Sequence, residues 1–133
     1  MTIIGINLNS IKAEVKNRVV KGNLNINSTP NIKSIEKRNV LDMEAIAIEF
    51  EFETKYEPDI ASISIAGELV YNTDDAKKLL KKWKDDKKLP EEIAVEILNV
   101  IFRKCLTKAI VLSEDIGIPP PLSFPVVRPK EDE

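Results

Sequence analysis

A two-residue alternation of apolar and acidic side chains in residues 46–53 constrains the fold of this chain more than any other feature. The apolar positions are Ile46, Ile48, Phe50 and Phe52, and the acidic positions are Glu49, Glu51 and Glu53. Successive side chains of a β-strand point to opposite faces, so this spacing predicts a strand. One face of that strand must meet a core, and the other must meet water or a basic partner.

Two more segments alternate in the same way and predict strands. Residues 61–69 follow a turn signal at Glu57-Pro58-Asp59, which predicts an antiparallel hairpin with the first strand. Residues 4–15 also alternate, but the apolar positions change phase after Ser10. A phase change of one residue is typical of a β-bulge.

Residues 20–27 complete the alternating segments, but the chain beyond them is harder to interpret. Ser28-Thr29-Pro30-Asn31 predicts a turn, because proline and small polar residues punctuate strands. Residues 32–40 are polar and fit either a further strand or an irregular edge. The sequence leaves these two possibilities open.

From Thr73 onward the apolar spacing becomes helical. A stripe of Ala76, Leu79, Leu80 and Trp83 predicts a short charged helix. A second helix is predicted from Pro90 to about Ser113, because proline suits a first helical position and Gly117 suits a stop. Its apolar residues cover about half of the circumference, more than one sheet contact requires, which predicts a second contact such as an oligomer interface.

The residue inventory excludes several enzyme classes. The chain has no histidine and one cysteine, Cys105. Ser-His-Asp triads, Cys-His dyads and histidine zinc sites are therefore excluded. Cys105 falls in the apolar arc of the long helix, which predicts a buried and inert thiol. We expect a cytoplasmic protein with no catalytic residues, no metal and no cofactor. Neither a signal peptide nor an apolar run of about 20 residues is visible, so no membrane partner is expected.

Two charged clusters have both a functional and an ordinary interpretation. Glu49, Glu51 and Glu53 share one strand face, which fits a solvated surface, a docking face or a divalent-cation ladder. Several lysines in residues 77–88 surround Trp83, which could suit a nucleic acid. Aspartates interleave with them and the net charge is −2, so a solvated helix is favoured and no nucleic-acid partner is expected.

Four segments resemble the SecB family of export chaperones. They are Ile11-Lys12-Ala13-Glu14, Ser64-Ile65-Ala66-Gly67, the helical set Asn99, Phe102, Arg103, Cys105 and Thr107, and Pro120-Pro121-Leu122-Ser123-Phe124-Pro125. The order of strands first and a long helix late is also similar to that family. The chain departs from the pattern in its extra charged helix between Tyr71 and Pro90.

The resemblance implies an α+β fold with a four-stranded antiparallel sheet packed by a long C-terminal helix. The helical spacing after Thr73 adds the shorter charged helix. The chain length predicts a single domain, which we place at residues 1–126 as SecB-like, and the charged composition predicts a flexible tail at 127–133. The resemblance also implies a homotetramer built as a dimer of dimers, and a motor or antitoxin as partner. In such proteins an acidic sheet face docks the SecA motor, a part that Glu49, Glu51 and Glu53 could play.

The leading functional hypothesis is an ATP-independent holdase that binds non-native polypeptides in apolar grooves, with a link to protein export. The aromatic residues expected to contact clients are Phe50, Phe52, Trp83 and Phe102. The residues expected at the oligomer interface are Leu98, Phe102 and Leu106. Two alternatives are a hot-dog-like acyl-binding protein or thioesterase, disfavoured because its long helix precedes most strands, and a structural subunit of a larger complex.

Overall fold

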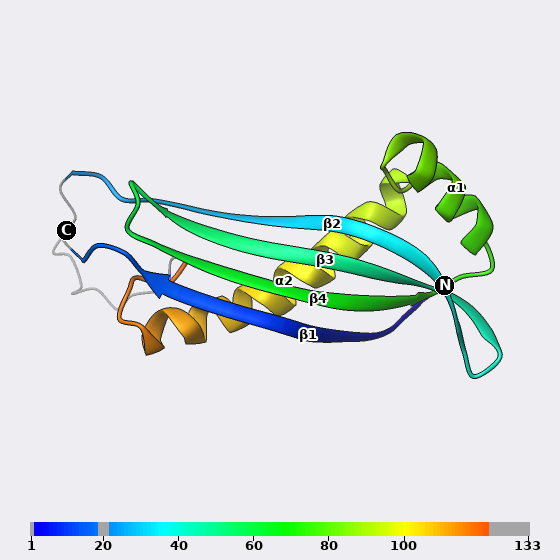
Figure 1. The fold of residues 1–133 in the computed structure, drawn as a ribbon, viewed down its shortest axis with the longest axis horizontal. Coiled ribbons are helices and arrows are strands. Elements are labelled where there is room, and N and C mark those ends of the chain that lie inside the picture. Colours follow the sequence, from blue (N-terminus) through cyan, green and yellow to red (C-terminus); the bar gives the residue numbers. More distant parts are fainter. Residues whose placement is uncertain (1, 19–21, 123–133) are drawn as a thin grey trace, which may run out of the picture.

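The chain folds as four antiparallel strands followed by two helices, which confirms the predicted α+β class (Figure 1). This is a computed structural model, and it describes residues 2–18 and 22–122. The elements are β1 (Thr2–Val15), β2 (Asn25–Val40), β3 (Met43–Glu57), β4 (Ala61–Asn72), α1 (Ala76–Asp86) and α2 (Glu91–Asp115). The tail predicted at 127–133 lies outside the described residues.

The sheet order is β1-β4-β3-β2, with every neighbouring pair antiparallel. β2, β3 and β4 follow one another as hairpins, and β1 lies beside β4 at the far edge, which is a Greek-key arrangement. The hairpin predicted on either side of Glu57-Pro58-Asp59 is therefore confirmed. β1 and β2 become the two edge strands of the sheet.

Two irregularities shape β1. Its pairing with β4 shifts between Ile3 and Gly5, and again between Leu8 and Ser10. The second shift confirms the bulge expected from the sequence. An extra residue lets Leu8 and Ile11 face the same side of the sheet although three positions separate them. Ile11 consequently pairs with Ile65 of β4 on the apolar face.

β2 is longer than the sequence indicated, and the turn predicted at Ser28-Thr29-Pro30-Asn31 is wrong. These residues pair continuously with β3, and Pro30 lies opposite Phe52. An edge strand tolerates proline because one side of its backbone makes no ladder hydrogen bonds. Ser28 also fits, since its hydroxyl lies 2.9 Å from the Thr54 hydroxyl across the pair. The ambiguous residues 32–40 are the second half of this strand.

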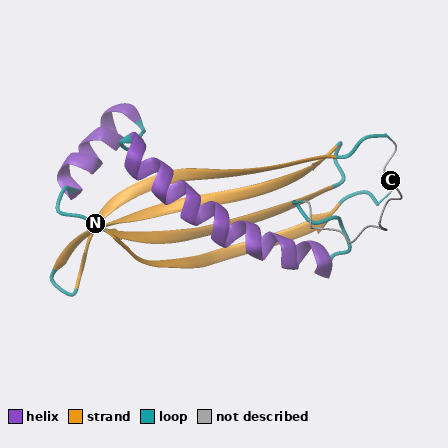
Figure 2. Ribbon diagram, turned by 180° about the vertical axis from the view of Figure 1, so that it is seen from behind, coloured by secondary structure: helices purple, strands orange, loops and turns teal. Residues whose placement is uncertain are grey.

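The core lies between one face of the sheet and α2, which crosses the strands obliquely (Figure 2). The inward residues of β3 and β4 are almost completely buried: Ile46, Ile48, Phe50, Phe52, Ile63, Ile65 and Leu69. α2 covers them with a straight stripe of Ile97, Ile101, Cys105 and Ala109. The spacing of four residues keeps this stripe on one side of the helix.

Both helices begin and end close to their expected positions. α1 stops at Asp86, where Lys87 adopts a left-handed conformation with φ of 58°. Pro90 precedes the first turn of α2, and Glu91 and Glu92 lie in that turn. Acidic side chains there oppose the positive end of the helix dipole. Within the described ranges, neither helix is long and apolar enough to cross a membrane.

Arg18 fixes the far end of α2. Its guanidinium donates hydrogen bonds to the carbonyl oxygens of Ile116 at 3.0 Å and Gly117 at 3.3 Å. Tyr56 of β3 donates a further hydrogen bond to the Pro119 carbonyl at 2.5 Å. A cation at a helix C-terminus satisfies carbonyls that have no partner within the helix. These contacts tie the C-terminal end of α2 to the ends of β1 and β3.

Candidate functional site

The oblique path of α2 leaves an open groove between the helix and the edge strand β1. We name it the β1 groove, and its volume is about 550 Å³. Its lining residues are Ile6, Leu8, Ile11, Val100, Arg103, Lys104, Thr107, Lys108 and Val111. Ile11 is 44% exposed and Val111 is 48% exposed, so apolar surface lies open to solvent here. Exposed apolar surface collected in one concave place is typical of a binding site.

A second groove lies on the other side of α2, and we name it the β2 groove. Its volume is about 790 Å³. Its lining residues are Pro30, Asn31, Ile32, Lys78, Lys82, Trp83, Lys87, Lys88, Leu89, Pro90, Glu91, Ala94 and Leu98. β2 forms one wall, and α1 with the start of α2 forms the other. The extra helix between Tyr71 and Pro90 therefore builds one wall of a groove.

Each groove runs beside an edge strand, which adds a second means of binding. Within the described part of the chain, β1 and β2 each have one neighbouring strand. Their outer backbone groups can accept an added strand, and the groove beside them can take its side chains. The arrangement suits an extended polypeptide better than a compact small molecule.

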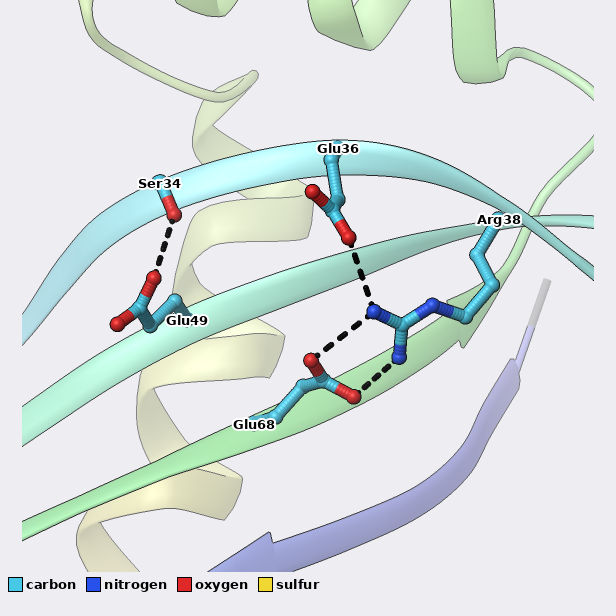
Figure 3. Close-up of polar contacts among 5 residues, drawn as sticks. All are labelled: Ser34, Glu36, Arg38, Glu49 and Glu68. Atoms are coloured by element: carbon cyan, nitrogen blue, oxygen red, sulfur yellow. Dashed lines mark hydrogen bonds and ion pairs between the residues drawn. The ribbon is translucent and has the colours of Figure 1, made fainter. Parts of the chain in front are cut away.

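The opposite face of the sheet carries several glutamates of β2, β3 and β4. Most of these glutamates form a hydrogen bond or an ion pair with a neighbouring side chain (Figure 3). Ser34 donates a hydrogen bond to Glu49 at 3.0 Å. Arg38 bridges Glu36 and Glu68 from β2 to β4. The remaining predicted docking residues also pair, because Glu51 lies 3.7 Å from Lys33 Nζ and Glu53 lies 3.3 Å from Lys55 Nζ. Neighbouring cations and a hydroxyl thus compensate much of the negative charge on this face.

No group of three or more carboxylates or thiolates that could hold a metal occurs among the described residues. Cys105 lies on the face of α2 that packs against the sheet and is completely buried. Burial raises the pKa of its thiol to about 11, which keeps it protonated and unreactive near neutral pH. Burial also raises the pKa of Tyr56 to about 12. Neither residue lines the β1 groove or the β2 groove.

The aromatic residues expected to contact clients occupy different places. Phe50 and Phe52 have no exposed surface and lie in the core beneath α2. Phe102 packs edge-on against Phe52 with ring centroids 5.7 Å apart. Trp83 lines the β2 groove. In this conformation, therefore, Trp83 alone of the four lies on a groove, and client contact by the others stays a prediction.

The residues expected at an oligomer interface all lie on α2 and are partly buried in the single chain. Leu98 lines the β2 groove. Leu106 packs against the core and does not line either groove. Part of the wide apolar arc of α2 is therefore explained by the sheet itself. An interface through Leu98, Phe102 and Leu106 remains a prediction.

Sequence reasoning missed most of the β1 groove. The phase change in β1 was the available signal, because it places Ile11 on the helix face with Ile6 and Leu8. The basic residues Arg103, Lys104 and Lys108 gave no signal, since isolated cations on a helix usually mean a solvated face. Their common position follows from the path of α2.

Neither a family model nor a curated protein matches this sequence. Among solved structures, the chain is similar to the Mycobacterium tuberculosis Rv1957 SecB-like chaperone, solved in complex with a ChAD peptide from the Rv1956 HigA1 antitoxin. The TM-score is 0.63 at 13% sequence identity, and the match covers 95% of this chain and 88% of that one. The chain therefore has a SecB-like fold, as its sequence indicated.

Proposed function

We propose that this protein is an ATP-independent holdase that binds extended segments of non-native polypeptides in the two grooves beside α2. The observation that carries the proposal is the pairing of an open apolar groove with an edge strand on each side of one helix. Burial of client side chains supplies the affinity, and added-strand hydrogen bonds supply a contact that does not depend on client sequence.

The structural neighbour supports the same proposal from a different direction. That SecB-like chaperone is recorded with a peptide from an antitoxin, so its fold can hold a polypeptide segment. For this chain, an antitoxin is one class of client within the proposal. A link to export by way of a motor docked on Glu49, Glu51 and Glu53 is a separate proposal. Its support is that the three carboxylates share one strand face, although Lys33 and Lys55 already compensate two of them.

The hot-dog-like alternative loses support from the chain order. Both helices follow the last strand, and α2 lies across the sheet as an outer layer (Figure 2). The alternative of a structural subunit makes a different prediction, namely one fixed partner and no general affinity for unfolded chains.

The test is suppression of aggregation of a chemically unfolded enzyme, followed by light scattering without nucleotide. The wild-type protein is expected to suppress scattering and to saturate at a fixed ratio. The double variant Ile11→Asp with Val111→Asp places two charges in the β1 groove. It is expected to weaken client binding about tenfold, because client side chains can no longer bury apolar surface against these two positions. Both residues are about half exposed, so the fold tolerates the change.

Val95→Asp is the matched control, because Val95 is 52% exposed on the same helix and lines neither groove. It is expected to behave like the wild type. Folding of all variants is checked by circular dichroism. Failure of the folded wild-type protein to bind any unfolded client would remove the proposal. Equal losses in the control and the double variant would show that the β1 groove is not the binding site.

A further inference from the structure

The charged residues that line the two grooves are mainly basic. Both grooves beside α2 are lined by cations: Arg103, Lys104 and Lys108 in the β1 groove, and Lys78, Lys82, Lys87 and Lys88 in the β2 groove. Among the described residues that line the two grooves, one is acidic, namely Glu91 in the β2 groove. Glu36, Glu49 and Glu68 lie on the opposite face of the sheet (Figure 3), and other carboxylates lie on the helices outside the groove linings. A net charge of −2 therefore conceals two locally basic grooves.

The groove cations are largely free to meet a ligand. Lys82 forms an ion pair with Asp86 at 3.6 Å, one turn further along α1. The other six cations make no ion pair with any residue of the described ranges. This differs from the outer face, where Glu49, Glu51 and Glu53 each have a neighbouring cation or hydroxyl. Unpaired like charges along one groove attract an oppositely charged ligand.

The apolar strand residues and the cations lie on different sides of the β1 groove. In the β1 groove, Ile6, Leu8 and Ile11 come from the strand, whereas the cations come from α2. An extended chain that lies between them presents its side chains alternately to two sides. Apolar side chains can then face the strand while carboxylates face the helix. About 12 extended residues span the length of α2, which is about 37 Å.

We infer that the grooves select apolar polypeptide segments that carry aspartate or glutamate within or beside the apolar run. The inference rests on the proposed function and adds the class of client. A nucleic acid suits the linings less well. The β1 groove has five apolar residues and no aromatic side chain on which bases could stack, and the β2 groove has one aromatic side chain, Trp83. A segment rich in lysine meets like charge in both grooves.

The experiment uses three fluorescent peptides of about 12 residues with one apolar core and flanking glutamates, serines or lysines. Fluorescence anisotropy with the full chain gives each Kd. The glutamate peptide is expected to bind about tenfold more tightly than the serine peptide at low salt, and the lysine peptide more weakly than both. Raising the salt to 1 M shortens the screening length from about 10 Å to about 3 Å, so the three affinities should converge.

Charge-reversal variants locate the effect. Lys104→Glu with Lys108→Glu alters the β1 groove, and Lys78→Glu with Lys88→Glu alters the β2 groove. Each is expected to weaken the glutamate peptide and strengthen the lysine peptide. Lys77→Glu with Lys81→Glu is the matched control, because both lysines are exposed on α1, line neither groove and change the net charge equally.

The outcomes separate this inference from the proposed function. If the three peptides bind with equal affinity, or if the control variant has the same effect, the charge selectivity is overturned while the holdase stands. Failure of every peptide to bind overturns both. A single-stranded oligonucleotide of similar length that binds more tightly than the glutamate peptide overturns the inference in favour of a nucleic acid.

Discussion

At the scale of single residues, Gly67 is the position where the sheet depends most on a missing side chain. It lies in the interior of β4, between Leu8 of β1 and Phe50 of β3. A Cβ atom there would lie 2.2 Å from the Asn7 carbonyl oxygen and 2.8 Å from the Phe50 ring. Backbone cannot retreat from such a contact without a change in strand pairing. The glycine therefore permits the close approach of β1 at its bulge.

Gly67→Ala is expected to lower the free energy of unfolding by about 1–3 kcal/mol, the usual cost of overpacking. Gly5→Ala is the matched control, because a Cβ atom at Gly5 meets nothing within 4 Å. Its expected change is within about 0.5 kcal/mol. Urea unfolding of both variants measures the difference. Equal stabilities would mean that β1 can move away from β4 at little cost.

Cys105 makes stability depend on pH in the alkaline range. Burial raises the pKa of its thiol from the ordinary 9.0 to about 11 in the folded protein. Below pH 9 both states hold the proton and the contribution is fully present. Between pH 9 and 11 the unfolded state releases its proton first, so the free energy of unfolding falls as the pH rises.

Cys105→Ala is expected to be less stable at pH 7, because it leaves a cavity under α2, but to lose stability less steeply between pH 9 and 11. Urea unfolding at a series of pH values gives the two slopes. Tyr56 has its folded pKa at about 12 and contributes to both proteins alike. Parallel slopes would show that the thiol is not shielded in the folded state.

At the scale of elements, the phase of the apolar alternation in β1 decides whether the strand side of the β1 groove is apolar. Asn9 is the extra residue between the pairs of Leu8 with Gly67 and Ser10 with Ala66. Deletion of Asn9 leaves Leu8 and Ile11 on the same face, because a regular strand then alternates from Leu8 through Ser10 to Ile11. Deletion of Lys12 instead moves the side chains of residues 13–15 to the opposite face of the sheet.

Deletion of Asn9 is expected to change the free energy of unfolding by less than about 1 kcal/mol and to preserve peptide binding. Deletion of Lys12 is expected to cost about 1–3 kcal/mol, since Ala13 and Val15 turn outward and Glu14 turns inward. Urea unfolding and peptide anisotropy measure both effects. Two equally damaged proteins would show that the bulge itself, and not the phase of the pattern, holds β1 in place.

The elements that could be predicted from sequence are those in which local signals agree with one another. The β3–β4 hairpin was predictable because alternation and turn chemistry agree over residues 46–69. β2 was not, because Pro30 signals a turn in sequence while an edge strand accommodates it in the sheet. The grooves could not be predicted, because they depend on the angle at which α2 crosses the strands. That path follows from packing between distant segments, and Arg18 and Tyr56 hold the end of α2 through contacts with residues about 60 to 100 positions away.

At the scale of the whole molecule, the free edge of β1 and the exposed apolar side chains of α2 bear on how copies of the chain could assemble. Among the described residues, β1 has one neighbouring strand, and α2 keeps partly exposed apolar residues such as Leu98 and Leu106. Leu98 belongs both to the β2 groove and to the predicted interface. A contact between copies that covers Leu98 would narrow the β2 groove and leave the β1 groove to bind clients. Assembly and client capacity are therefore coupled in the proposed holdase.

The predicted dimer of dimers can be tested by sedimentation velocity at several concentrations. The expected mass is four times the 15.0 kDa of one chain. Leu106→Asp is expected to shift the mass toward the dimer or the single chain, because it places a charge in the predicted helix interface without touching either groove. Leu41→Asp is the control, since Leu41 is 88% exposed in the β2–β3 turn and should leave the mass unchanged. A wild-type protein that sediments as a single chain at every concentration would contradict the assembly, and the apolar surface of α2 would then belong to client binding alone.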